Sequence, residues 1–148
     1  MAEATTESLK ADIAAAYDTY MLELNQAGPH WERKPAGSAG GEDAWCARQV
    51  AEHLVGAAAF FGSGIANAVG VAGPTPSRVT LADGAAAVAA MPPAHDGLMA
   101  VIGQVSDAQL SNEMELGPLG KTTVGGVMGV VAYHLNDQAN QLKTLRGG

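Results

Sequence analysis

Four segments of the chain carry apolar side chains at intervals of three and four residues, and this spacing constrains the fold more than any other feature. Such spacing places the apolar side chains of a segment on one face of an α-helix. Glycine and proline are concentrated between the segments, where they favour turns and loops. The segments cover about residues 5–27, 42–69, 80–105 and 122–146. The pattern predicts an all-α fold, a four-helix bundle that forms a single domain over residues 1–148.

Composition supports helices over sheets. The chain has 29 alanines among 148 residues, and aromatic residues make up only 5%. Alanine is the strongest helix former, whereas strands are enriched in β-branched and aromatic residues. Hydrophobic residues make up 47% and charged residues only 16%. That balance excludes an intrinsically disordered chain, which has little apolar content and a high net charge.

The connections between the predicted helices carry signals of their own. Residues 28–42 read as a loop, in which Trp31 is expected to fold back onto the bundle. Adjacent prolines, Pro92 and Pro93, predict a break or kink in the third helix. The spacing of Ser106 and Gln109 is that of a capping box and predicts a short helix. Residues 111–121 then predict a short extended excursion before the last helix.

Charge and cysteine content bear on partners and location. The formal net charge is −7 and the isoelectric point is near 4.9. An acidic surface repels phosphate, so we expect no nucleic-acid partner. Cys46 is the lone cysteine and cannot form an internal disulfide, which agrees with a reducing compartment. The acidic start of the chain lacks the basic and apolar regions of a signal peptide, so a cytoplasmic protein is expected.

One stretch leaves a membrane-spanning alternative open. Residues 54–73 carry no charge and are numerous enough to cross a bilayer. The stretch consists largely of alanine and glycine, however, and it contains Ser63 and Asn67. Alanine and glycine contribute little to membrane insertion. A buried core helix with no membrane contact is therefore the preferred interpretation.

Two histidines lie on the apolar faces of different predicted helices. His53 follows Val50 at three residues, and His134 follows Val131 at three residues. The interior of a helix bundle is where facing helices build metal and cofactor sites, and imidazole is a common metal ligand. Gln138 lies one turn beyond His134 and shares its face. The spacing alone leaves two readings open, a metal site or structural histidines that satisfy their ring nitrogens by hydrogen bonds.

Two motifs carry a resemblance to a known family. The segment that runs from Trp45 through Cys46 to His53 and Leu54 resembles the tryptophan-to-histidine-leucine signature of the DinB/YfiT-like superfamily. The segment that runs from His134 to Leu142 resembles that superfamily's final-helix motif, which has two ligands four residues apart followed by Gln-Leu. The order of the predicted elements resembles the superfamily over nearly the whole chain. Related proteins include the mycothiol-dependent maleylpyruvate isomerases.

The resemblance implies a metal site in the four-helix bundle. His53 matches the first ligand and His134 the second. Gln138 occupies the third position, where the family commonly has histidine. The ion implied is a divalent transition metal, namely zinc, nickel or iron. An amide oxygen binds such ions more weakly than imidazole does, so Asp137 or His95 is an alternative third ligand.

The resemblance also implies a function. The expected protein is a DinB-like metal-dependent enzyme, a thiol-dependent transferase or isomerase that acts on a small molecule with a low-molecular-weight thiol as cofactor. A homodimer is the expected assembly. The alternative is a metal-free helical-bundle module for binding or dimerisation, in which His53, His134 and Gln138 form a hydrogen-bonded cluster. Replacement of the third histidine by Gln138 is the feature that favours this alternative.

Overall fold

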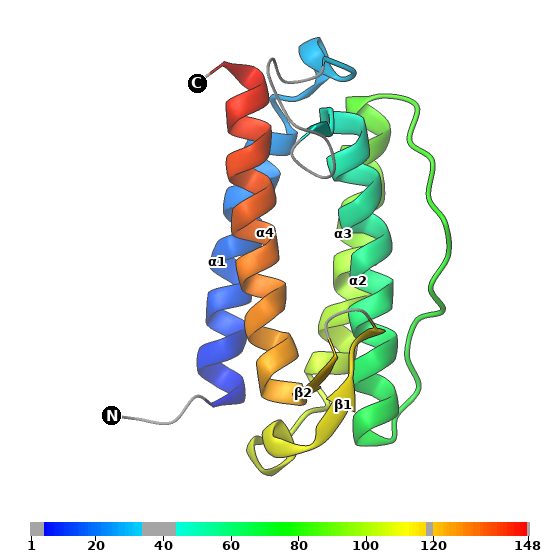
Figure 1. Ribbon diagram of the computed structural model, residues 1–148, viewed down its shortest axis with the longest axis vertical. Helices are drawn as coiled ribbons and strands as arrows, with labels where there is room; N and C mark the ends of the chain where they lie inside the picture. Colours follow the sequence, from blue (N-terminus) through cyan, green and yellow to red (C-terminus); the bar gives the residue numbers. More distant parts are fainter. Residues whose placement is uncertain (1–4, 34–43, 118–119, 148) are drawn as a thin grey trace.

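Four long helices dominate the computed structural model, which describes residues 5–33, 44–117 and 120–147 (Figure 1). The helices are α1 (Thr6–Leu24), α2 (Ala47–Val69), α3 (Gly84–Ile102) and α4 (Val124–Arg146). Short elements lie between them: the 3₁₀ turns η1 (Gly28–His30) and η3 (Asp107–Ser111), and the strands β1 (Glu113–Glu115) and β2 (Lys121–Thr123). The predicted all-α four-helix bundle is confirmed.

Capping residues fix the ends of the first and last helices. The Thr5 side chain accepts a hydrogen bond from the Ser8 backbone N–H at 3.1 Å, as expected for a residue at the helix start. Thr123 does the same for α4, where it accepts from the Gly126 N–H at 3.1 Å. Gly147 closes α4 with φ +86°, a left-handed conformation that glycine adopts without a steric cost. The predicted start of the first helix near residue 5 and the predicted end of the last helix near residue 146 are confirmed, whereas α1 ends at Leu24, earlier than the predicted residue 27.

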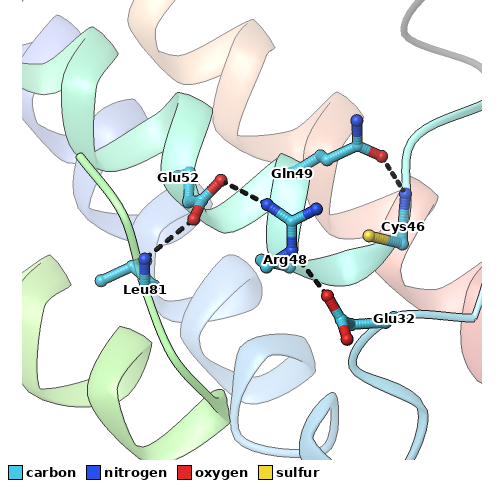
Figure 2. Close-up of polar contacts among 6 residues, drawn as sticks. All are labelled: Glu32, Cys46, Arg48, Gln49, Glu52 and Leu81. Carbon is cyan, nitrogen blue, oxygen red and sulfur yellow. Dashed lines mark hydrogen bonds and ion pairs between the residues drawn. The ribbon is translucent and has the colours of Figure 1, made fainter. Parts of the chain in front are cut away.

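The start of α2 corrects the sequence analysis. We predicted a start near Glu42 and Asp43, which lie outside the described residues, but the helix begins at Ala47. Cys46 has an extended backbone and is the capping residue. Its N–H donates to the side-chain oxygen of Gln49 at 3.0 Å, so a reciprocal cap begins the helix here (Figure 2). Cys46 is 2% exposed and packs in the interior.

The helices form two parallel pairs. α1 packs mainly against α4, and α2 packs mainly against α3. Figure 1 shows α1 and α4 ascending while α2 and α3 descend. An ion pair between Arg146 and Glu23, with 2.9 Å between nitrogen and oxygen, joins the C-terminal ends of α4 and α1. Because α2 and α3 run in the same direction, the chain must cross the whole length of the bundle between them.

Residues 70–83 make this crossing, and we call them the crossover segment (Figure 1). A helix as long as α2 spans about 35 Å at 1.5 Å per residue, whereas the extended crossover segment reaches about 46 Å. The segment must therefore be extended rather than helical. Gly73 brings it close to α2, since a Cβ at this position would lie 2.5 Å from the Ala66 Cβ and 3.2 Å from the Gly62 carbonyl oxygen.

The connection before α4 follows the prediction closely. η3 forms where the capping box was predicted, and the Ser106 N–H donates to the Gln109 side chain at 2.9 Å. β1 and β2 then pair as an antiparallel hairpin with Met114 opposite Thr122. The hairpin continues through Thr123, so α4 begins two residues later than predicted.

Two further expectations concern α3 and the loop after α1. α3 continues without a break through Pro92 and Pro93, so the predicted break does not occur. Packing against α2 holds α3 helical where two backbone donors are missing. Trp31 is 8% exposed and belongs to the core, which confirms that it folds back onto the bundle.

The stretch that left a membrane span open is part of the protein core. Most of residues 54–73 belong to α2, where Leu54, Phe61 and Ile65 are buried against the other helices. In the part of the chain that the structure describes, α3 is the one helix long and apolar enough to span a bilayer. α3 packs against α2 within the bundle, and core helices of this kind meet the same criterion.

Candidate functional site

The side chains of His53 and His134 meet between α2 and α4. Their Nε2 atoms are 2.9 Å apart, and both residues are half-buried. This is hydrogen-bond distance, so in a metal-free pair one Nε2 carries the proton and the other accepts it. The sequence analysis expected two imidazoles from distant parts of the chain to converge inside the bundle, and the structure brings them together. We call these two residues the histidine pair.

Aromatic rings hold the histidine pair in place. The ring centroids of Trp45 and His53 are 4.9 Å apart, with the rings tilted by 57°. The rings of Phe61 and His134 are nearly perpendicular at a centroid distance of 6.1 Å. Trp45 is the residue that begins the family-like motif, and its position explains the spacing of that motif. Trp45 precedes α2, and its ring lies beside the His53 imidazole.

An open cleft of about 750 Å³ adjoins the histidine pair. Its walls come from α2, α4, the crossover segment and the hairpin region. Volumes of roughly 300–1,000 Å³ are typical of sites for small molecules, and such sites combine apolar walls with a few polar groups. The lining residues are Glu52, His53, Gly56, Ala57, Phe60, Phe61, Ser77, Arg78, Val79, Leu116, Val130, Tyr133 and His134.

Glu52 ties one wall of the cleft to α2 (Figure 2). Its carboxylate accepts a hydrogen bond from the Leu81 backbone N–H at 2.8 Å, which anchors the crossover segment beside His53. The second oxygen binds the Arg48 guanidinium at 3.0 Å. Arg48 also pairs with Glu32 at 2.9 Å. The charge of Glu52 is therefore compensated, and its structural role is to hold the crossover segment.

Gln138 is fully buried one turn beyond His134. Its amide nitrogen donates to the Gln141 side-chain oxygen at 3.2 Å. Within the described residues its own oxygen, Oε1, has no hydrogen-bond partner. A buried oxygen without a partner is costly, so this atom is available to a ligand. Asp137, the alternative third ligand on this helix, is exposed.

His95 lies on the inner side of His134, away from the cleft. It stacks on Tyr17 with 3.7 Å between ring centroids and 10° between ring planes. His95 and His134 both line a small cavity of about 10 Å³, whose other lining residues are apolar. Burial lowers the pKa of His95 below 6.5, while the nearby Asp96 and Asp18 oppose this shift. His95 is therefore held neutral by its packing.

The donor set fits a metal ion only in part. In the described ranges, no group of three His, Cys, Asp or Glu side chains is placed to hold a metal ion. The histidine pair supplies two nitrogens 2.9 Å apart. Two nitrogen ligands on one tetrahedral ion lie about 3.3 Å apart, so a small rotation of either ring would accommodate the ion. Gln138 Oε1 is the third donor that the same helix face offers.

Comparisons with known proteins give one structural relative. No family model and no curated protein matches the chain. One solved structure, the colibactin self-resistance protein ClbS in complex with a double-stranded DNA, is similar with a TM-score of 0.68. The match covers 100% of this chain and 99% of ClbS at 13% sequence identity. The two proteins therefore share a helical fold over their full described lengths.

The comparison corrects one expectation. We excluded a nucleic-acid partner because the chain carries a net charge of −7. That exclusion is wrong, since a protein with this fold was solved in complex with double-stranded DNA. The net charge is a sum over the whole molecule, whereas contact with phosphate depends on the local placement of basic and hydrogen-bonding groups.

Sequence reasoning missed most of the cleft. Arg78 lies in a stretch that appears only as a connection in the sequence, and its place beside α2 depends on the direction of the crossover. Tyr133 precedes His134 and falls outside the apolar stripe of α4, yet it lines the cleft. Phe60 belongs to the stretch that was expected to form a buried core helix, yet it is 42% exposed. Its position next to Phe61 gave a partial signal, because two adjacent residues cannot share one helix face.

Proposed function

We propose that the chain is a DinB/YfiT-like protein that acts on a small molecule in the cleft, with the histidine pair and Gln138 holding a divalent transition metal ion. The observation that carries the proposal is the convergence of the two Nε2 atoms at the wall of an open cleft. The position of Trp45 beside His53 supports the family assignment. The full-length similarity of fold to ClbS is compatible with it.

The residues around the histidine pair have separate roles in this proposal. His53 and His134 contribute neutral Nε2 donors, which requires the proton on Nδ1 of each ring. Gln138 contributes its unpartnered Oε1. When bound, a zinc, nickel or iron ion would act as a Lewis acid that activates a thiol or water. Phe60, Phe61 and the neighbouring apolar residues exclude water from the apolar part of the small molecule.

A metal-free binding module is the second candidate, and two observations favour it. The 2.9 Å separation is that of a direct hydrogen bond between two neutral imidazoles. The described residues also offer no third charged or imidazole ligand. In this candidate a proton shared between the two Nε2 atoms takes the place of the ion. The histidine pair then offers the ligand polar contacts without a Lewis acid.

Elemental analysis of untagged protein, followed by zinc titration, separates the two candidates. We expect zinc binding that His53→Ala and His134→Ala each abolish. Gln138→His should raise the zinc affinity about tenfold or more, because imidazole is a better donor than an amide oxygen. Asp137→Ala is the matched control on the same helix and should leave zinc binding unchanged.

Folded protein that binds no zinc at millimolar excess would reject the metal-dependent enzyme and leave the metal-free module. Circular dichroism of each variant establishes that a loss of zinc binding is not a loss of fold. Zinc binding that survives both alanine variants would place the ion elsewhere and reject the proposed ligands.

Double-stranded DNA is a further partner to test, because ClbS was solved with one. Arg78 is an exposed cation at the edge of the cleft and is the group that would meet a phosphate there. Fluorescence anisotropy with a labelled duplex at low and moderate salt is the direct measurement. Binding that weakens with salt and with Arg78→Gln would support contact at this edge, and no binding at low salt would reject it.

A further inference from the structure

Arg78 is the cleft residue whose charge is not compensated within the described structure. It is exposed on the crossover segment and lines the cleft. The described ion pairs engage Arg48 with Glu32 and Glu52, and Arg146 with Glu23, but none of them includes Arg78. Glu52 is the carboxylate in the cleft lining, and Arg48 and the Leu81 N–H already occupy it. The cleft therefore presents a positive charge in a protein whose net charge is −7.

The backbone around Arg78 is held on both sides. Three residues later, the Leu81 N–H donates to Glu52. One residue earlier, the carbonyl oxygen of Ser77 lies 3.8 Å from the position that a Cβ on Gly56 would occupy, so the segment passes close to α2 there. Gly73 anchors the start of the segment against α2. A guanidinium carried on a backbone fixed in this way loses less freedom on binding than one on a loose loop.

Exposed aromatic side chains line the same cleft. The large hydrophobic side chains that are exposed in the described structure are Leu22, Phe60 and Tyr133. Phe60 is 42% exposed and Tyr133 70% exposed, and both line the cleft. Exposed apolar surface concentrated in a concave site is typical of ligand binding. Phe60 comes from α2 and Tyr133 from α4, so a flat apolar group can contact both helices at once.

From this arrangement we infer that the cleft binds a small amphipathic anion, whose aromatic or apolar body packs on Phe60 and Tyr133 and whose carboxylate meets Arg78. Guanidinium binds carboxylate through two parallel hydrogen bonds, which sets the orientation of the ligand as well as its affinity. The inference rests on the proposed function, since it uses the same cleft, but it does not depend on a metal ion.

A pair of probes of nearly equal shape tests the charge requirement. The probes are 1-naphthaleneacetate and the uncharged 1-naphthaleneacetamide, titrated against the protein as purified and monitored by naphthalene fluorescence and calorimetry. We expect the acetate to bind about tenfold more tightly than the amide, as for one charge-assisted contact at a partly exposed site. Arg78→Gln should remove this preference and leave amide binding unchanged, whereas Arg78→Lys should retain part of it.

Two controls separate this inference from the metal proposal. Lys143→Gln removes an exposed charge from α4 outside the cleft lining and should preserve the preference for the acetate. Repeating the titrations with a chelator removes any metal ion, and the preference should persist. If the preference disappears with the chelator or in His134→Ala, but not in Arg78→Gln, the anion binds at the histidine pair and the role of Arg78 is rejected.

Two further outcomes would reject the inference. Equal affinities for acetate and amide in the unmodified protein reject an anionic ligand. Failure of both probes to saturate at about 1 mM rejects the amphipathic site itself. Zinc binding is measured separately. If the protein prefers the acetate but binds no zinc, this inference stands and the proposed metal-dependent enzyme is rejected.

Discussion

His134 lies between two regions of the molecule, and the histidine in each region has a different environment. On its inner side, His95 stacks on Tyr17 and borders a small cavity of about 10 Å³. On its outer side, His53 borders an open cleft of about 750 Å³. His95 is 7% exposed, whereas His53 is half-buried. We refer to these as the inner region and the cleft.

The two regions differ in burial, because His95 is enclosed by packing whereas the histidine pair faces the cleft. The inner region has space for about one water-sized sphere, so a ligand cannot enter it. His95 there is kept neutral by desolvation, which lowers its pKa. The imidazoles of the histidine pair, by contrast, line the open cleft. The two regions should therefore respond differently to substitution.

The largest difference is expected for truncation of an apolar side chain. Leu98→Ala in the inner region should lower the free energy of unfolding by about 2–5 kcal/mol, because Leu98 is 2% exposed and its removal enlarges the cavity. Phe60→Ala in the cleft should lower it by about 1 kcal/mol, since much of that side chain is already exposed. Urea denaturation measures both. Equal losses would mean that the cleft wall belongs to the core.

A smaller effect is expected where the crossover segment touches α2. Gly73→Ala should destabilise the protein by about 1–3 kcal/mol, because its Cβ would lie 2.5 Å from the Ala66 Cβ. Gly97→Ala is the matched control, since a Cβ there meets nothing within 4 Å. The control should stabilise α3 by about 0.5–1 kcal/mol. A tolerated Gly73→Ala would show that the crossover segment is not seated as described.

The smallest expected effect is a pH dependence specific to the inner region. The pKa of His95 is lowered from 6.5, so the unfolded chain binds its proton more readily than the folded protein does. The stability that neutral His95 contributes is thus fully present above pH 6.5 and declines as the pH falls below that value. His95→Phe should remove this acid-side decline. Thermal unfolding of both proteins from pH 7.5 to 5 measures it, and parallel curves would contradict it.

The helices could be predicted because their signals are local. Apolar spacing, the cap at Thr5 and the glycine at Gly147 each act within a few residues, and all three correspond to observed helix features. The predicted start of α2 was misplaced because Glu42 and Asp43 are of the acidic type that helix N-termini favour through the helix dipole. A reciprocal cap between Cys46 and Gln49 determined the actual start. A helix cap can be recognised from the sequence only when the capping residue is one of the common types, and cysteine is not one of them.

The candidate site was predictable only where it lies on helix faces. His53 and His134 share apolar faces that point to one interior, so their meeting followed from periodicity. The walls of the cleft could not be predicted from periodicity, because their arrangement depends on the direction in which α3 runs relative to α2. Short connections favour antiparallel neighbours, and the sequence does not state that residues 70–83 run back along the bundle. The position of Arg78 is a consequence of that topology.

The crossover segment also supplies a reporter of occupancy. Trypsin cuts after arginine in extended, exposed chain, and Arg78 is exposed on a segment without helix or strand. A molecule seated against Arg78 would shield that peptide bond, so the rate at which fragments cut after Arg78 appear gives a gel-based readout of cleft binding. The long connection that two parallel neighbouring helices require thus places a trypsin cleavage site beside the candidate functional site, where cleavage reports on ligand binding.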